Sequence, residues 1–168
     1  MSYKAKKTIV SIMTGLFLLV VYVIYVFGKV QSGAASLDDL RFWAITILAF
    51  IGIGVVVMII IQIIFHILMS IAMAVQEQMR KGQCDDKAVE KQIELEMVED
   101  EMDKLIELKS MRISFGIVGA GFVLALGSLA LGWPPAVMLN ILFGSFSIGS
   151  MIEGFVQIHY YSKGINNS

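Results

Sequence analysis

The distribution of charge constrains this chain more than any other feature of its sequence. No Lys, Arg, Asp or Glu occurs in residues 8–28, 42–76 or 113–152, which are stretches of 21, 35 and 40 residues. Together they hold 96 of the 168 residues, and 57% of the whole chain is hydrophobic against 16% charged. A soluble domain carries a larger charged fraction, spread more evenly along the chain. The pattern predicts an all-α membrane protein and excludes a soluble enzyme or a nucleic-acid binder.

Two of these stretches divide simply into membrane spans. A helix of about 20 apolar residues crosses the hydrocarbon core of a bilayer, so residues 8–28 predict one span. The 40-residue stretch contains Trp133-Pro134-Pro135 near its middle. Because proline disfavours helix at and before its own position, this tripeptide predicts a turn between two spans. We place those spans at about 113–132 and 136–158.

The 35-residue stretch is too long for one crossing and too short for two crossings with a turn. It contains no proline, so we expect one helix, with a span over about 42–66 that extends beyond the bilayer to residue 81. The first span should be uncleaved, because its run of about 20 apolar residues exceeds the core of a signal peptide. The expected organisation is a single transmembrane domain of four helices over residues 1–168.

Lysine and arginine flank the predicted spans unevenly. Three precede the first span, seven lie between the second and third, and one follows the fourth, whereas the loop between the first and second spans has two. Because cationic loops stay in the cytoplasm, we expect a multi-pass protein of a bacterial-type inner membrane with both termini cytoplasmic. Cys84, the only cysteine, would then lie in a reducing compartment and form no intrachain disulfide.

Residues 77–112 predict a cytoplasmic helical hairpin between the second and third spans. Gly82 indicates a turn, and the apolar residues that follow it recur at helical spacing. The hairpin would pair the extension of the second helix with an amphipathic helix leading into the third span. The facing apolar residues would be Ile71, Val75 and Met79 on one side and Val89, Ile93, Met97, Val98, Met102, Leu105 and Ile106 on the other.

The second helix of this hairpin has an acidic face. Its carboxylates follow helical spacing, at Glu96, Glu99, Asp100, Asp103 and Glu107. One interpretation is a solvated face on a helix held by its apolar side. The other is a docking surface for a basic protein partner or for divalent cations, although a straight row of carboxylates surrounds one ion only with help from a second chain.

The segment Glu99–Lys109 resembles a motif of small four-span bacterial membrane proteins of unknown function. Their pattern reads Asp-Glu-Arg-Asp, then Leu-Ile and a basic residue, just before the third span. This chain has Met102 where that motif has arginine, and it keeps Asp100, Glu101, Asp103, Leu105, Ile106 and Lys109. The resemblance covers about eleven residues plus the topology. It implies a regulatory or stress-linked role, because such proteins are often encoded beside small helix-turn-helix regulators.

Ionisable side chains within membrane spans are costly and are therefore candidates for function. His66 on the second helix and Glu153 on the fourth both fall near the cytoplasmic interface. Gln62 precedes His66 by one turn and Gln157 follows Glu153 by one turn. These four residues predict an inner-leaflet cluster, which would be either a proton or cation site or an interhelical hydrogen bond.

Small residues four apart recur in the third and fourth spans and permit close approach between helices in lipid. Some serve contact between these two spans, and the others favour a homodimer. The pairs are Gly116 with Ala120, Gly121 with Ala125, Ser128 with Gly132, Ser145 with Gly149, and Ser150 with Gly154.

Motifs for catalysis and cofactor binding are absent from the sequence. There is no phosphate-binding loop, no GxSxG, no HExxH and no CxxC, and one Cys with two His leaves no metal or cofactor site to predict. We therefore expect a non-enzymatic membrane protein with an interaction or regulatory role through its acidic hairpin. The alternatives are a small dimeric transporter of ions or solutes that uses Glu153 and His66, and an immunity or stress-tolerance protein.

Overall fold

The structure, a computed structural model, describes residues 3–81 and 101–163 as four long helices with no strand among them. The predicted all-α class is confirmed. Each helix is long and apolar enough to cross a membrane. In chain order the helices are α1 (Tyr3–Gln31), α2 (Leu40–Lys81), α4 (Glu101–Ala130) and α5 (Pro135–Lys163).

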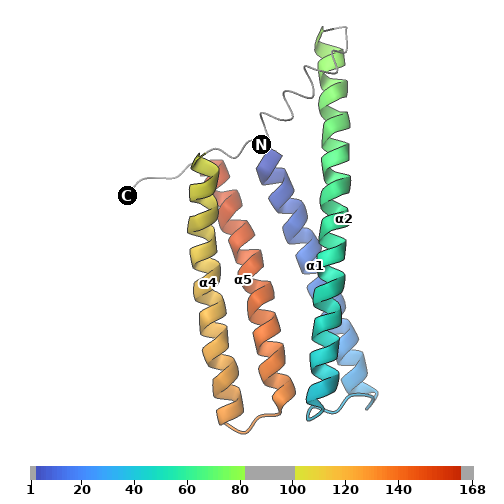
Figure 1. Cartoon of the computed structure of the whole chain (residues 1–168), viewed down its shortest axis with the longest axis vertical. Coiled ribbons are helices and arrows are strands. Elements are labelled where there is room, and N and C mark those ends of the chain that lie inside the picture. Colours follow the sequence, from blue (N-terminus) through green and yellow to red (C-terminus); the bar gives the residue numbers. More distant parts are fainter. Residues whose placement is uncertain (1–2, 82–100, 164–168) are drawn as a thin grey trace.

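The four helices run alternately up and down (Figure 1). We call the end at which α1 and α4 begin and α5 ends the terminus end of the bundle. The opposite end, which holds the connections at 32–39 and 131–134, is the loop end. Because α5 packs against α4, α1 and α2, it is the central helix of the described structure. Helix α1 begins between α5 and α2 at the terminus end and crosses behind α2 toward the loop end (Figure 1).

Helix α2 is one unbroken helix of 42 residues, as the uninterrupted apolar stretch predicts. Its last turns extend past the terminus end of the other helices (Figure 1). On this extension Ile71 is 55% exposed and Val75 is 46% exposed. The proposed hairpin turn at Gly82 and the apolar residues at 89–98 lie outside the described residues. On α4, Met102 and Leu105 are exposed, whereas Ile106 is fully buried.

The turn between α4 and α5 falls at the predicted tripeptide. Gly132 adopts φ = 78°, a left-handed conformation that suits glycine because it has no Cβ. The backbone N–H of Trp133 donates to the carbonyl of Ser128 at 3.1 Å, which closes the end of α4. Pro135 then occupies the first position of α5, where its missing N–H costs no helical hydrogen bond.

Close packing of α4 on α5 depends on the predicted small residues. A Cβ on Gly121 would overlap the side chain of Ser145, and a Cβ on Gly149 would lie 3.1 Å from the Ser114 hydroxyl. Gly116 and Ala120 are exposed, so they do not serve this contact. Several of the small residues are therefore used within the chain rather than between chains.

Helix α2 is fastened to the bundle at the loop end. Asp39 caps it, since its Oδ1 accepts from the backbone N–H of Phe42 at 3.0 Å. Trp43 is only 1% exposed, and its Nε1 donates to the carbonyl of Ser36 at 2.9 Å. The backbone N–H of Ala136 donates to the Leu37 carbonyl at 3.2 Å, which ties this connection to the start of α5.

Candidate functional site

A large groove runs along the bundle between α2 and α5, with α1 as its third wall. Its volume is about 1320 Å³, which exceeds the roughly 300–1,000 Å³ of most small-molecule sites. Near the start of α2, the side chains of Trp43 and Thr46 are buried against the bundle. From Ile47 to Ala72 none of its side chains is buried, so the rest of α2 leaves space beside it.

The loop end of the groove is aromatic. The ring of Tyr22 on α1 meets Phe50 of α2 at 5.1 Å and Phe143 of α5 at 4.5 Å between ring centroids. The Tyr22 hydroxyl donates to Asn140 Oδ1 at 2.6 Å, and the Asn140 amide donates to the carbonyl of Ala136 at 2.7 Å. Tyr22 is 4% exposed. This layer joins three helices near the loop end of the groove.

The terminus end of the groove is polar and carries its charged groups. Four helices contribute to it, through the first turns of α1 and α4 and the later turns of α2 and α5. The polar lining residues at this end are Lys4, Lys7, Thr8 and Ser11 of α1, Gln62 and His66 of α2, Asp103 and Glu107 of α4, and Glu153, Gln157 and Tyr161 of α5. The groove is thus amphipathic along its length.

Glu153 lies farther from the terminus end of the groove than Asp103 and Glu107, the other two acidic lining residues. It precedes the end of α5 by 10 residues, or about 15 Å at the rise of an α-helix. Its side chain is half-buried, and Gln157 Nε2 donates to its Oε1 at 3.4 Å. Among the described residues no lysine, arginine or histidine forms an ion pair with Glu153. Its negative charge therefore faces the groove with only an amide donor beside it.

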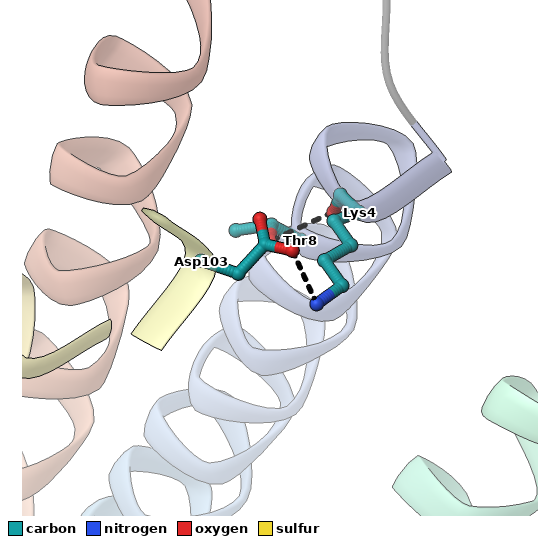
Figure 2. Close-up of polar contacts among 3 residues, drawn as sticks. All are labelled: Lys4, Thr8 and Asp103. Atoms are coloured by element: carbon teal, nitrogen blue, oxygen red, sulfur yellow. Dashed lines mark hydrogen bonds and ion pairs between the residues drawn. The ribbon is translucent and has the colours of Figure 1, made fainter. Parts of the chain in front are cut away.

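An ion pair joins α1 to α4 at the mouth of the groove. Lys4 Nζ lies 2.7 Å from Asp103 Oδ2, and both side chains are about one-fifth exposed (Figure 2). Thr8 Oγ1 lies 3.0 Å from the Lys4 carbonyl and 3.3 Å from Gln157 Oε1. A polar chain thus connects Asp103, Lys4, Thr8, Gln157 and Glu153 across three helices. It holds α1 against both α4 and α5.

The structure places the four residues of the predicted inner-leaflet cluster in this one groove. Gln62 and His66 line it from α2, and Glu153 and Gln157 line it from α5. Glu153 and Gln157 are hydrogen-bonded to each other. His66 and Glu153 thus belong to opposing walls of the same groove, as a shared site requires.

The candidate docking face is divided by the structure. Of its five acids, Glu96, Glu99 and Asp100 lie outside the described residues. Asp103 is held by Lys4, and both Asp103 and Glu107 line the groove. The two described acids therefore line the groove's mouth, and Glu107 is also exposed.

Sequence reasoning missed two features of the site. One is the pairing of Lys4 with Asp103, which no local pattern indicates because the residues are 99 positions apart. The other is the Tyr22–Asn140 hydrogen bond, for which a signal exists, since Asn140 is the only asparagine in a predicted span. Within residues 3–81 and 101–163 no three His, Cys, Asp or Glu side chains gather closely enough to hold a metal ion.

No protein-family profile, curated protein or solved structure matches this chain.

Proposed function

We propose that this chain is a four-span membrane protein, with both termini in the cytoplasm, that binds a small amphipathic solute in the groove as a transporter. The observation that carries the proposal is the groove's polarity. A half-buried carboxylate, Glu153, lies toward one end, and an aromatic layer lies toward the other. Binding sites for small molecules combine such an apolar lining with a few placed polar groups.

Placement in a membrane is supported by the exposed surface. Large apolar side chains cover the outside of the helices, among them Phe115 at 78% exposure and Leu131 at 75%. In water such a surface would drive aggregation, whereas lipid solvates it. The Lys and Arg asymmetry supports the cytoplasmic assignment of the terminus end, which would give the polar mouth of the groove access to the cytosol.

Within the described residues, the low burial of α2 beyond Thr46 supports transport over static binding. Alternating access requires one part of a transporter to move against another around the site. Helix α2 is buried at Trp43 and Thr46 and only partly covered beyond them. A helix hinged at the loop end could widen or narrow the groove without breaking a packed core.

The groove favours this function over an interaction role for the acidic hairpin. Asp103, a central member of the predicted docking face, is neutralised by Lys4 within the chain. Glu107 lines the groove beside it. Both acids therefore have a place in the solute site, and neither requires an external basic partner.

A groove-filling substitution tests the proposal. Gly15 lines the groove, and a Cβ there would meet nothing within 4 Å, so Gly15→Leu fills space without a backbone clash. Gly119→Leu is the matched control. Gly119 also lies within a helix, and a Cβ there would meet nothing within 4 Å, but Gly119 does not line the groove. Both variants and the parent protein would be placed in lipid nanodiscs and titrated with cationic, neutral and anionic aromatic probes.

The expected result is saturable binding of at least one probe by the parent protein and by Gly119→Leu, with a loss of at least about tenfold in affinity for Gly15→Leu. Empty nanodiscs measure partition of each probe into lipid. The proposal is overturned if no probe binds above that background, or if both glycine variants bind like the parent.

A further inference from the structure

The charges and rings of the groove specify its solute more narrowly. We propose that the groove binds lipophilic monocations, molecules in which one permanent or protonated cationic centre is attached to aryl or alkyl groups. This inference rests on the proposed function and names the class of solute for the same site. Glu153 would hold the cationic centre, and the aromatic loop end would hold the apolar groups.

The charge balance of the lining favours a cation. Five formally charged side chains line the groove, and two of them, Lys4 and Asp103, neutralise each other at 2.7 Å. Lys7 and Glu107 are exposed, so water and salt screen both of them. The remaining charge is the half-buried carboxylate of Glu153. A cation beside Glu153 would be attracted more strongly than a cation beside an acid at the exposed mouth, because partial burial lowers the local dielectric constant.

The position of Glu153 relative to the rings matches a solute with a charged centre and an apolar part. Phe143 precedes Glu153 by 10 residues on α5, which places the two about 15 Å apart along the helix axis. Phe50, Phe146 and Tyr161 also line the groove. Aromatic faces attract cations and stack on aryl groups, so a triaryl or alkylaryl cation would meet favourable partners on either side of the carboxylate.

The groove also discriminates against an anion of the same shape. An anionic centre placed at Glu153 would meet like charge, with no described lysine or arginine paired to that carboxylate. Like charges in a partly desolvated site disfavour binding strongly. The geometry therefore predicts selectivity by charge among molecules of equal size.

Tetraphenylphosphonium and tetraphenylborate provide the direct test, because they have nearly the same size and shape and opposite charge. Triphenylphosphine oxide serves as a neutral aryl probe. Each would be titrated by isothermal calorimetry against the full chain in nanodiscs made of a zwitterionic lipid, with empty discs subtracted. We expect saturable binding of the phosphonium, with an affinity at least about tenfold higher than that for the borate.

Two charge variants separate the site from the overall charge of the terminus end. Glu153→Gln removes the charge with little change in shape and should weaken phosphonium binding at least about tenfold. Glu101→Gln removes one negative charge from the same end, at a residue that does not line the groove. The affinity of this variant for the phosphonium should stay within about twofold of that of the parent protein. Glu153→Asp keeps the charge and should retain most of the phosphonium binding. It shows that the loss in Glu153→Gln comes from the missing charge and not from a folding defect.

The outcomes distinguish this inference from the function on which it rests. If the borate or the neutral probe binds better than the phosphonium, and Gly15→Leu abolishes that binding, the groove is a solute site but its solute is not a cation. That result retains the proposed function and overturns the cationic assignment. Equal loss in Glu153→Gln and Glu101→Gln also overturns it, because a general surface-charge effect would then explain the result. Absence of binding by all three probes overturns both proposals.

Discussion

The hydroxyl of Tyr22 on α1 lies 2.6 Å from Oδ1 of Asn140 on α5, within an otherwise apolar part of the bundle. This hydrogen bond fixes α1 against the central helix near the loop end of the groove. In lipid, interhelical hydrogen bonds contribute modestly, about 0.6 kcal/mol on average. Its second role is geometric, because it orients the Tyr22 ring between Phe50 and Phe143.

Removing the Tyr22 hydroxyl should therefore cost little stability. We expect Tyr22→Phe to lower the free energy of unfolding by about 0.5–1.5 kcal/mol, since the ring packing is kept and one hydrogen bond is lost. Tyr25→Phe is the control, because Tyr25 is 41% exposed, and it should change stability by less than about 0.5 kcal/mol. Reversible unfolding in mixed micelles measures both, and equal effects of the two variants would contradict a specific role for the Tyr22 hydroxyl.

The ion pair between Lys4 and Asp103 should couple α1 to α4. In a double-mutant cycle of Lys4→Gln and Asp103→Asn, we expect a coupling energy of about 0.5–1 kcal/mol, because the pair is partly exposed and its attraction is screened. Lys6→Gln replaces Lys4→Gln in the control cycle, since Lys6 is exposed on the same helix. That control should couple to Asp103→Asn by less than about 0.3 kcal/mol. A coupling near zero for the Lys4 cycle would show that the contact does not hold the helices.

The crossing of α1 over α5 depends on a glycine. A Cβ on Gly154 would lie 2.5 Å from Ile12 Cγ1, so Gly154→Ala should destabilise the protein by about 1–3 kcal/mol through overpacking. Ile12→Ala removes both Ile12 Cγ1 and Cδ1, so Gly154→Ala should cost less stability in an Ile12→Ala background than in the parent protein. Gly127→Ala is the control, because a Cβ there meets nothing within 4 Å and alanine favours helix slightly. Thermal denaturation of the parent and these variants measures each cost, and an equal cost of Gly154→Ala in both backgrounds would contradict the proposed contact.

The proposed orientation, with both termini in the cytoplasm, predicts opposite labelling of the two ends of the bundle. In a Cys84→Ser background, Ser36→Cys at the loop end and Ser162→Cys at the terminus end both introduce exposed thiols. A membrane-impermeant maleimide should label Ser36→Cys in intact bacterial cells, and it should label Ser162→Cys only after permeabilisation. Labelling of Ser162→Cys alone in intact cells would reverse the proposed orientation.

Prediction from the sequence succeeded for features that depend on the residues of one segment alone. Charge-free length indicated the number of helices, and Pro134-Pro135 indicated the turn between α4 and α5. The uninterrupted apolar run predicted the continuous α2. The intramembrane His66 and Glu153 also stand out locally, because ionisable residues are rare in apolar stretches.

The sequence by itself thus determined the helices and the solvent they require, because both follow from hydropathy and periodicity within a segment. The tertiary structure alone decided which faces meet. It brought Lys4 to Asp103, Tyr22 to Asn140, and the side chains of α2 and α5 to opposite walls of one groove. Contacts between distant segments depend on how helices cross and rotate, and lipid gives no hydrophobic preference among apolar faces. Charge-free stretches indicated which segments can enter a membrane, whereas the packing of the helices created the groove beside α2.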